Sequence, residues 1–413
     1  MTAHPVPAIA PIPPITPIAP IAVVAQGLAC ASGVGLQTLA DLLRQGGSAL
    51  VPNTFSHTPL ATWVGRLPGL EDTPLPATLA HWDCRATRAA HMGLLADDFI
   101  SAAHAACRRH GAARVGLVLG TSASTIGASE LAYRTLAADG GFPPALRSES
   151  LNTLHAVTAF VQEALGVQGP CTTVSTACSS SAKAFATAER WLRLHLVDAV
   201  VVGGVDALSD SLLFGFASLG LVSPEPCQPF GAGRRGISIG EAAGFALLQR
   251  GPGALQLIGH GESNDAHHMS TPHPQGLGAE RALDQALARA GIHAAAVDCV
   301  NLHGTASTHN DAVEAALVAR RYGPQVHASA TKGCTGHTMG AAGIVEALVC
   351  LLALQGGLRA GTAGTHTVDP ELGDDFAQRL KLAPVQAETR IAVNHSFGFG
   401  GNNCVLVFGK GRG

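Results

Sequence analysis

The chain has 413 residues, 47% of them hydrophobic, and a formal net charge of −3. This length exceeds one typical domain, so two core units are expected. Charged residues are scattered with no basic arm or acidic tail, which argues against a nucleic-acid-binding protein. The ten cysteines include no Cys-x-x-Cys pair. Without a secretory signal, this pattern favours free thiols in a reducing cytoplasm over a disulfide framework.

Residues 1–20 form a leader rich in proline, alanine and isoleucine, with seven prolines. The first charged residue of the chain is Asp41. The leader lacks the basic region and the uninterrupted apolar region of a signal peptide. Its frequent prolines also exclude a membrane helix, because each removes a backbone donor. We expect an extended, poorly ordered segment without chemistry.

After the leader, short apolar runs alternate with helical patterns. Residues 21–25 predict a strand and residues 36–45 a helix, and the glycines between them do not form the Gly-x-Gly-x-x-Gly pattern of dinucleotide binding. The run at 199–202 is continuously apolar, which is typical of a strand covered on both faces. Further elements are predicted as strands at 114–120, 171–174, 198–205, 245–249 and 255–259 and a helix at 179–196.

The pattern restarts after about residue 260. Its predicted elements are helices at 279–290, 312–321 and 341–354 and strands at 297–302, 326–330, 390–394 and 404–408. Two successive α/β units favour layered sheets sandwiched by helices. We therefore expect an N-terminal half at 21–260 and a C-terminal half at 261–413, preceded by the leader at 1–20.

Cys178 lies where a predicted strand meets a predicted helix, in the sequence Ser-Thr-Ala-Cys-Ser-Ser-Ser. The apolar residues at helical spacing on one face of that helix are Phe185, Ala188, Leu192 and Leu196. At a helix N-terminus, unpaired N–H groups and the helix dipole favour the thiolate, which is the nucleophilic form. Most cysteines are buried structural residues. The pattern alone therefore leaves a catalytic and a structural role open until a base is found.

Two histidines and a lysine lie in glycine- and threonine-rich segments of the second half. His303 follows a predicted strand, where loops of layered folds carry function. Lys332 and His337 occur in Lys-Gly-Cys-Thr-Gly-His, and only four lysines occur in the chain, so composition does not easily explain the pair. No spacing of the His-Glu-x-x-His kind occurs, and His267 and His268 are too close for both rings to chelate one ion. We expect no metal.

A glycine-rich turn, Phe397-Gly-Phe399-Gly-Gly, separates the last two predicted strands. Its glycines let the backbone approach a ligand closely, so that N–H groups can point at an oxyanion. The same residues would also form a tight hairpin, and both interpretations stay open.

The cysteine elbow, the His-Gly-Thr segment, the Lys-x-x-x-Gly-His loop and the Phe-Gly-Phe-Gly-Gly turn occur in the order found in β-ketoacyl-acyl-carrier-protein synthases of the thiolase superfamily. The chain resembles that family over residues 21–409. The resemblance implies an α/β fold, a thiolase-like five-layered αβαβα sandwich of two related halves, and a dimer. It implies an acyltransferase that condenses an acyl-enzyme thioester with malonyl carrier protein, with loss of carbon dioxide. No cofactor is implied, because phosphopantetheine arrives on the carrier-protein substrate.

The resemblance also implies roles for individual residues. Cys178 is the expected nucleophile, and His303 and His337 are the expected pair that promotes decarboxylation. Lys332 resembles the family's electrostatic support, with Glu346 as its expected partner.

Phe399 resembles the family's gate residue, and its amide and that of Cys178 resemble an oxyanion hole. The remaining residues that the resemblance places at the substrate are Ser270, Thr305, Ser307 and Phe397.

One segment departs from the family pattern. Where the family commonly reads Pro-Phe-Asp-x-x-Arg-Asp-Gly-Phe, residues 229–237 read Pro-Phe-Gly-Ala-Gly-Arg-Arg-Gly-Ile, so two acids are lost and an arginine is gained. Residues 229–243 and 303–311 look more like ketosynthases of aryl-polyene clusters. Fatty-acid and aryl-polyene biosynthesis therefore both stay open.

The expected partners are an acyl carrier protein and a second subunit, in a homodimer or in a heterodimer with a chain-length-factor-like ketosynthase homologue. We expect no nucleic acid, no membrane span and a cytoplasmic location. Carrier proteins are acidic, so Arg85 and Arg88, and with less support Arg234, are candidate docking residues; ordinary solvated arginines are the alternative.

Three other functions compete with this one. A thiolase usually has a second catalytic cysteine near its C-terminal glycine turn, but Cys404 lies in a predicted strand. A non-catalytic chain-length-factor subunit would lack the nucleophile, and an unrelated cysteine hydrolase would not explain Lys332.

Overall fold

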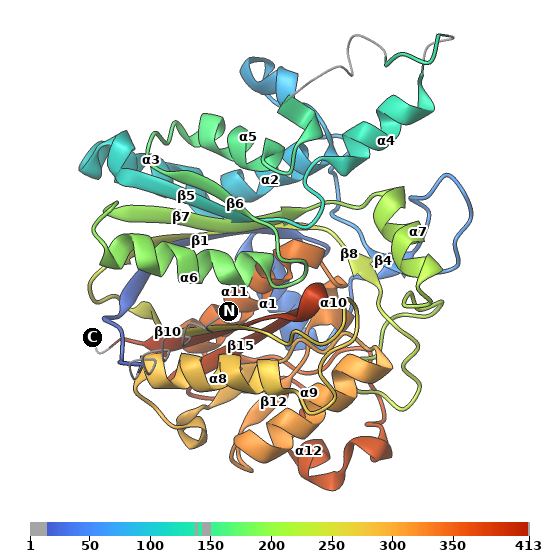
Figure 1. Ribbon diagram of the computed structural model, residues 1–413, viewed down its shortest axis with the longest axis vertical. Coiled ribbons are helices and arrows are strands. Elements are labelled where there is room, and N and C mark those ends of the chain that lie inside the picture. Colours follow the sequence, from blue (N-terminus) through green and yellow to red (C-terminus); the bar gives the residue numbers. More distant parts are fainter. Residues whose placement is uncertain (1–14, 137–138, 143–149, 412–413) are drawn as a thin grey trace, which may run out of the picture.

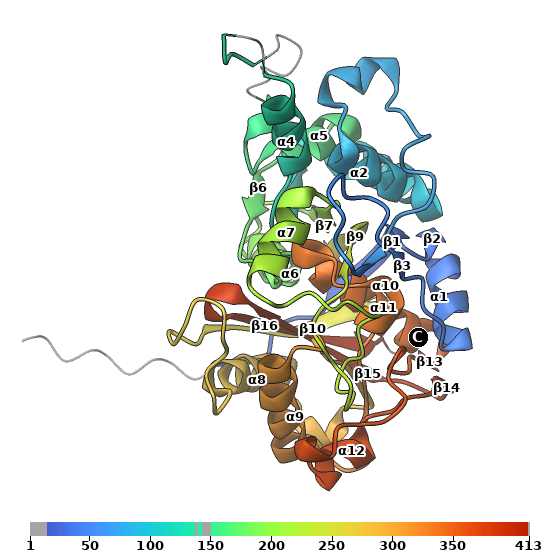
Figure 2. The same cartoon turned by 90° about the vertical axis from the view of Figure 1, so that its right-hand side faces the viewer.

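The computed structural model describes residues 15–136, 139–142 and 150–411. These residues form five layers, in which two sheets alternate with three layers of helices (Figure 1). The predicted αβαβα sandwich is confirmed. Figure 2 shows the same stack from the side, with the strands of the lower sheet between a central helix above and an outer helix below.

The first sheet is built from the N-terminal half. Its strands run in the order β2-β1-β9-β7-β5-β6. The strand bounds are β1 Ile21–Cys30, β2 Gly33–Val34, β5 Val115–Gly120, β6 Cys171–Val174, β7 Ala199–Asp206 and β9 Ala242–Arg250. β5 pairs in parallel with β6 and β7, whereas β9 is antiparallel to β7 and β1. Every residue of β5 and β7 is buried, in agreement with the continuous apolar runs.

The second sheet repeats this arrangement with strands of the C-terminal half. Its order is β10-β16-β15-β11-β12. The strand bounds are β10 Leu255–Asn264, β11 Cys299–Asn301, β12 His327–Ser329, β15 Ile391–Gly398 and β16 Asn402–Lys410. β11 pairs in parallel with β12 and β15, and β16 is antiparallel to β15 and β10. The strands β10-β16-β15-β11-β12 therefore have the same relative directions as the strands β1-β9-β7-β5-β6 of the first sheet. This correspondence is expected of two related halves.

Two central helices lie between the sheets, α6 (Ser180–Arg193) and α11 (Ala342–Gly356). α11 contacts strands of both sheets and is buried over almost its whole length. Residues 339–356 are long and apolar enough to cross a membrane by composition, but most of them are buried inside the protein. Their apolar character is explained by the core position.

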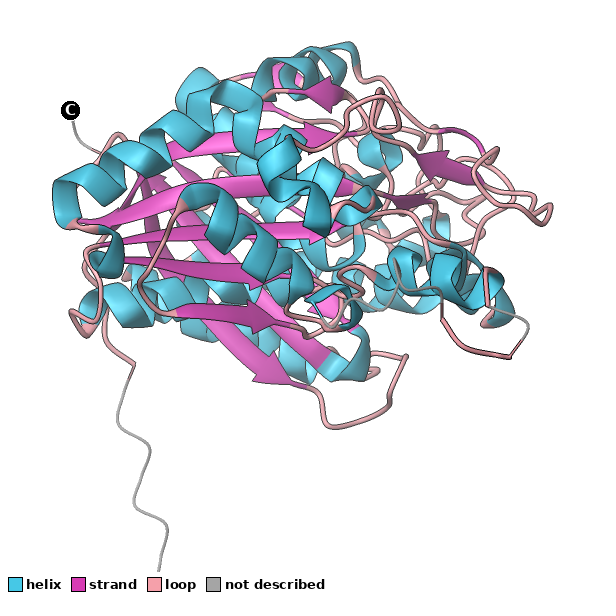
Figure 3. Cartoon of the chain, turned by 90° about the horizontal axis from the view of Figure 1, so that it is seen from above, coloured by secondary structure: helices cyan, strands magenta, loops and turns pink. Residues whose placement is uncertain are grey.

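The outer layers are helical as well. α2 (Arg85–Leu95), α3 (Phe99–His110) and α5 (Ala156–Leu165) cover the first sheet, and α8 (Leu277–Ala290) and α9 (Thr308–Arg321) cover the second. Seen from above, helices lie across the strands along the whole molecule (Figure 3). The remaining helices are α1 (Leu36–Gln45), α4 (Ile126–Arg134), α7 (Asp210–Ser218), α10 (Lys332–Thr335) and α12 (Asp374–Arg379).

Short strands complete the fold. A three-stranded sheet beside the functional site has the order β3-β4-β8, with bounds Val51–Pro52, Trp63–Gly65 and Ile239–Gly240. A two-stranded sheet joins β13 (Leu358–Arg359) to β14 (Val385–Gln386).

The predicted division of the chain at residues 260 and 261 stays a prediction; the chain passes from the first sheet to the second between Arg250 and Leu255. Most of the predicted leader, residues 1–14, lies outside the described residues. Its last part packs on α8, since the Ile18 amide donates to the Arg289 carbonyl at 2.8 Å.

The main differences from the predicted elements concern helices. The helix predicted at 179–196 ends at Arg193, so Leu196 lies beyond it and is 50% exposed, whereas Phe185, Ala188 and Leu192 are fully buried. The outer helices α2, α3 and α5 were not predicted. Alanine makes up much of the buried faces of α2 and α3, which gives a weak apolar periodicity. The buried face of α5 includes Val157, Phe160 and Val161, and its helical pattern was missed.

Candidate active site

Cys178 occupies the elbow between β6 and α6. The preceding residue, Ala177, has a φ of +52°, which is rare for a residue with a Cβ and is typical of strained turns at functional sites. Ser179 caps the helix, so Cys178 stands just before it. Its side chain is 5% exposed, and its Sγ lies 3.1 Å from Nε2 of His337.

The resting form of Cys178 differs from the sequence prediction. Burial raises the pKa of its thiol to about 11, although the charge of Lys332 and a hydrogen bond from the Phe399 backbone act in the opposite direction. The helix N-terminus was expected to favour the thiolate, but desolvation outweighs the favourable interactions, so the thiol form is the more stable one in the folded protein. A nearby group must accept the proton when the sulfur reacts.

His337 is positioned by its backbone. Its N–H donates to the Ser238 carbonyl at 2.7 Å, and its carbonyl accepts from Gly240 at 2.9 Å, so strand β8 holds it on both sides. Burial and the Lys332 charge hold the pKa of His337 well below its usual value, so the ring is neutral. Its Nδ1 atom is buried and has no hydrogen-bond partner among the described residues. No described contact fixes which ring nitrogen carries the proton.

His303 follows β11 and is held at its ring as well as at its backbone. Lys332 Nζ lies 3.2 Å from His303 Nδ1 and donates to the His303 carbonyl at 2.5 Å. Because an ammonium group can only donate, Nδ1 must accept, and the proton of the neutral ring then resides on Nε2. Burial and the Lys332 charge keep the pKa of His303 well below its usual range.

A buried carboxylate supports the His303 segment. Glu314 accepts hydrogen bonds from the backbone N–H groups of His303 and Gly304, each at 2.8 Å. The same carboxylate contacts His395 Nδ1 at 3.0 Å, and His395 Nε2 lies 2.8 Å from the Tyr322 hydroxyl. All these side chains are buried in the second half.

Lys332 and Glu346 form a buried ion pair behind the histidines, as expected. Burial raises the pKa of Glu346 to about 7, and Lys332 acts against that rise. Asn394 donates to the other carboxylate oxygen at 3.4 Å. The pair thus places a positive charge beside both histidine rings without reaching the cavity itself.

The side chains of Cys178, His303 and His337 meet at one point. The His303 and His337 rings are 5.4 Å apart and nearly perpendicular, and ligand atoms of the two rings and of Cys178 lie within 4.8 Å of one another. Such spacing could also hold a metal ion, but the Lys332 charge nearby disfavours a cation. The absence of a metal stays a prediction.

The glycine-rich turn approaches the elbow from β15. A Cβ added to Gly398 would lie 2.9 Å from the Thr176 carbonyl and 3.1 Å from the Cys178 amide, so only glycine fits without movement. This close approach brings the Phe399 backbone to the Cys178 sulfur. Phe399 packs its ring against Phe216 of α7, with centroids 5.7 Å apart.

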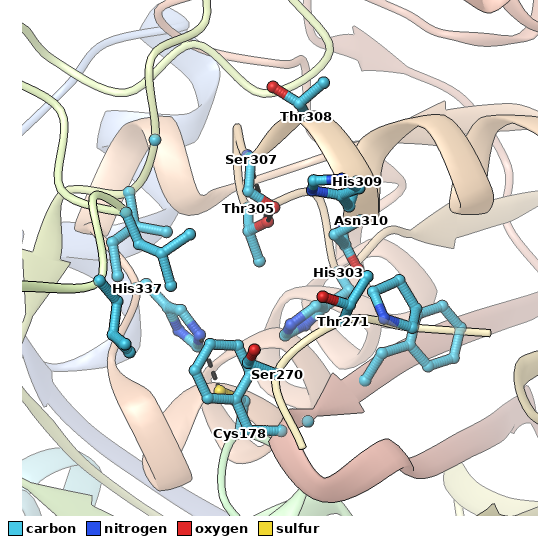
Figure 4. Close-up of a pocket in the computed structure, with 18 of the residues that line it drawn as sticks. Cys178, Ser270, Thr271, His303, Thr305, Ser307, Thr308, His309, Asn310 and His337 are labelled. Atoms are coloured by element: carbon cyan, nitrogen blue, oxygen red, sulfur yellow. Dashed lines mark hydrogen bonds between the residues drawn. The ribbon is translucent and has the colours of Figure 1, made fainter. Parts of the chain in front are cut away.

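A cavity of about 430 Å³ leads to this point. Figure 4 shows Cys178, His303 and His337 together at one end and Thr308 at the other. All of the predicted substrate residues line it, namely Ser270, Thr305, Ser307 and Phe397, and so does Phe399. Sequence reasoning missed several other lining residues, namely Phe216, Arg235, Thr308, His309 and Asn310. Except for Phe216, which had no sequence signal, these residues were indicated only by their proximity to the His-Gly-Thr and Arg-Arg-Gly segments.

The predicted docking arginines are not free. Arg85 donates to the fully buried Glu241 at 2.6 and 2.7 Å and also pairs with Glu71. Arg88 is paired with Asp83 at 2.6 Å.

Arg234 is 7% exposed and bonds to Asp369. All three arginines are thus ion-paired within the fold, which weakens the case for a docking cluster, and carrier docking at them stays a prediction.

Comparison with known proteins agrees with this geometry. Residues 19–254 match the N-terminal domain of beta-ketoacyl synthases, and residues 256–366 match the C-terminal domain of the same enzymes. The chain belongs to the beta-ketoacyl synthase family, in the thiolase superfamily. It is a 3-oxoacyl-acyl-carrier-protein synthase, an acyltransferase.

Individual relatives are moderately similar. Nodulation protein E of Rhizobium meliloti (strain 1021) is 34% identical over 328 residues, covering 75% of this chain and 80% of the relative. 3-Oxoacyl-[acyl-carrier-protein] synthase 2 of Staphylococcus aureus (strain COL) is 30% identical, covering 72% and 75%. The ketosynthase ApeO, solved in complex with its chain length factor ApeC from Xenorhabdus doucetiae, is 34% identical with a TM-score of 0.86, covering 95% and 98%.

Proposed function

We propose that the chain catalyses the decarboxylative Claisen condensation of an acyl group on Cys178 with malonyl carrier protein, and that His303, His337 and Lys332 carry the reaction with it. The supporting observation is the meeting of one thiol and two neutral histidine rings at the closed end of the cavity. Lys332 and Glu346 act on the histidines from behind.

In the first step the acyl group moves from the phosphopantetheine thioester to Cys178. The Cys178 sulfur bonds to the acyl carbon, its proton passes to His337 Nε2, and the carbon–sulfur bond to phosphopantetheine breaks. His337 then returns the proton to the departing thiol. The 3.1 Å contact supports this role for His337. Because the pKa of the thiol is raised and that of the histidine is lowered, the proton moves while the sulfur bonds to the acyl carbon and not before.

In the second step the malonyl group loses carbon dioxide. The electron pair of the broken carbon–carbon bond moves into a thioester enolate, whose oxygen accepts hydrogen bonds from the Nε2–H groups of His303 and His337. One such donor, placed where charge develops, is typically worth about 3 kcal/mol. Both rings must be neutral, which the low histidine pKa values support, and the Lys332 contact supports the Nε2–H tautomer of His303. His337 must carry its proton on Nδ1 in the first step and on Nε2 in this one, and no described contact of Nδ1 opposes that change of tautomer.

In the third step the enolate carbon attacks the acyl carbonyl on Cys178. The amides of Cys178 and Phe399 receive the oxyanion, and its collapse breaks the carbon–sulfur bond, releasing the 3-oxoacyl carrier. The sulfur regains a proton from His337, which water resupplies.

Two alternatives fit less well. The thiolase alternative needs a second cysteine at the reacting centre, but Cys404 is fully buried in β16 and does not line the cavity. The chain-length-factor alternative is disfavoured by Cys178 itself, which contacts His337.

The direct test is condensation with isotope-labelled malonyl carrier. The wild-type chain, mixed with an acyl carrier, should release labelled carbon dioxide and form a 3-oxoacyl carrier, and Cys178→Ala should form neither acyl adduct nor product. Release of carbon dioxide without product, also in the presence of a partner subunit, would contradict the proposal.

The finer proposal is a role in aryl-polyene biosynthesis, with a chain-length-factor-like subunit as partner. It is supported by the 34% identity to a ketosynthase that was solved with its chain length factor and by residues 229–243. Housekeeping fatty-acid synthesis as a homodimer is the alternative, supported by relatives of similar identity. Co-expression with a chain-length-factor-like homologue, followed by size and mass measurement, distinguishes a heterodimer from a homodimer.

A further inference from the structure

The cavity contains one charged side chain that has no partner among the described residues and no role in the proposed mechanism. Of the described residues that line it, only Arg235 and Asp265 are Arg, Lys, Asp or Glu. Asp265 is already occupied, because one carboxylate oxygen accepts from Asn403 Nδ2 at 2.8 Å and the other from the His273 amide at 2.9 Å. Arg235 has neither an ion pair nor a side-chain hydrogen bond within the described part of the chain, and its side chain is exposed.

The backbone around Arg235 is held in place. Its neighbour Arg234 is almost buried and bonds to Asp369. On the other side, Gly236 has a φ of +121° and donates its N–H to the Ala306 carbonyl at 3.1 Å. A Cβ at Gly236 would meet the Leu221 carbonyl at 2.2 Å, so the position requires glycine. The free guanidinium therefore stands on an anchored segment.

The same contacts place Arg235 away from the reacting end. Ala306, to which its segment bonds, directly precedes Ser307 and Thr308. Figure 4 shows these two residues on the far side of the cavity from Cys178. An exposed side chain on this segment stands at the solvent end of the cavity, whereas Cys178, His303 and His337 are buried at the closed end.

We propose that Arg235 binds the phosphate group of the phosphopantetheine arm while the thioester of that arm reaches Cys178. This inference rests on the proposed function, which makes that arm the substrate. The arm carries an anionic phosphate at its carrier end, and a guanidinium matches phosphate geometry with two parallel hydrogen bonds.

The malonyl carboxylate is the other anion of the substrate, but it fits this position less well. The carboxylate must reach the two histidines, where it leaves as carbon dioxide. A cation beside it would stabilise the carboxylate and oppose its loss. Arg235 at the solvent end avoids that conflict and binds the part of the substrate that does not react.

The experiment compares two small substrates that differ only by the phosphate, acyl-phosphopantetheine and acyl-pantetheine. Formation of the acyl adduct on Cys178 is followed by intact-protein mass spectrometry at several substrate concentrations. We expect Arg235→Ala to raise the apparent KM for acyl-phosphopantetheine about tenfold, as for one lost charge-assisted contact. Acyl-pantetheine should react equally with both proteins, and Arg235→Lys should retain part of the preference.

A matched control is Arg109→Ala on α3, an exposed arginine in the outer layer of the first half. This variant should leave the apparent KM for both substrates unchanged. The melting temperature of all variants should equal that of the wild type. Raising the salt concentration should reduce the wild-type preference for the phosphorylated substrate, since exposed charges are screened.

The outcomes are separable. Equal effects of Arg235→Ala on both substrates, or no effect on either, would overturn the phosphate site while leaving the proposed function intact. A wild-type chain that forms no adduct with either substrate or with acyl carrier would overturn the proposed function and this site with it.

Discussion

The two histidines of the site are held in different ways. His303 is held at its ring, because Lys332 Nζ contacts Nδ1, and at its backbone, because Glu314 accepts its N–H. His337 is held at its backbone by strand β8, and its ring contacts the Cys178 sulfur through Nε2, whereas its Nδ1 has no partner among the described residues. A ring with a fixed tautomer is suited to donate from Nε2 in every cycle. A ring without that restraint can accept a proton in one step and donate it in another.

The first prediction tests whether His303 and His337 serve different steps of the reaction. His303→Ala should still form the acyl adduct on Cys178 but should condense it about 100- to 1000-fold more slowly, the usual effect of losing one oxyanion donor. His337→Ala should slow both steps, because the Cys178 thiol, with a pKa of about 11, loses its proton acceptor. Intact-protein mass spectrometry measures the adduct, and product formation measures condensation.

Identical behaviour of the two variants would contradict the division of labour. If both form the adduct at the wild-type rate, the helix N-terminus alone activates Cys178 and His337 serves only the later steps.

The second prediction concerns the ring restraint on His303. Lys332→Met should lower the free energy of unfolding by about 3 kcal/mol, because Glu346 loses its buried partner. It should also slow condensation, because nothing then fixes the His303 tautomer. The double variant Lys332→Met with Glu346→Gln is the control. It should recover most of the stability but not the rate, and recovery of both would show that Lys332 has only a structural role.

The third prediction tests the backbone restraint on His337. Strand β8 leads directly into Glu241, whose carboxylate accepts from Arg85 and from the amides of Leu67 and Leu208. Arg85→Met should cost about 2 kcal/mol of stability through lost charge-assisted hydrogen bonds. It should also slow alkylation of Cys178 by iodoacetamide, because His337 is less well placed.

Arg88→Met is the matched control, since that arginine pairs with the partly exposed Asp83 and does not contact Glu241. A change of carrier salt dependence in Arg85→Met, with unchanged stability and alkylation, would instead support carrier docking at Arg85.

The fourth prediction uses pH and has the smallest effect. Both histidines are neutral in the folded protein, with a pKa well below 6.5, whereas in the unfolded chain they protonate near 6.5. The unfolded state therefore binds more protons below about pH 6.5, and stability is lost as the pH falls from that value towards the folded pKa. His337→Gln should reduce this slope by about one proton, about 1.4 kcal/mol per pH unit. Denaturant unfolding between pH 5 and 7 measures it, and an unchanged slope would mean that the folded His337 is protonated.

The local patterns of the sequence predicted the fold well, and the candidate reacting residues that they indicated lie together in the structure. Strand β6 and helix α1 have the predicted bounds, and the elbow that holds Cys178 follows from a strand run meeting a helical run. The glycine-rich turns identified the places where backbones approach closely, as Gly398 does at Cys178. These features depend on near neighbours in the chain.

Properties that depend on distant neighbours were not predictable in this way. The Arg85 guanidinium pairs with Glu241, which is 156 positions further on, so its charge looked free in the sequence. The pKa of Cys178 depends on how completely residues from both halves exclude water from its sulfur.

The sequence by itself determined the alternation of strands and helices, the elbow at Cys178 and the identity of the two histidines and the lysine. Only the tertiary structure decided that Cys178 rests as a thiol, that the His303 tautomer is set by Lys332, and that Arg235 rather than Arg85 or Arg234 has a free charge at the cavity. The physical reason is that burial and ion pairing act through space. Periodicity records which face of an element is apolar, but it does not record which charges meet when the two halves pack together.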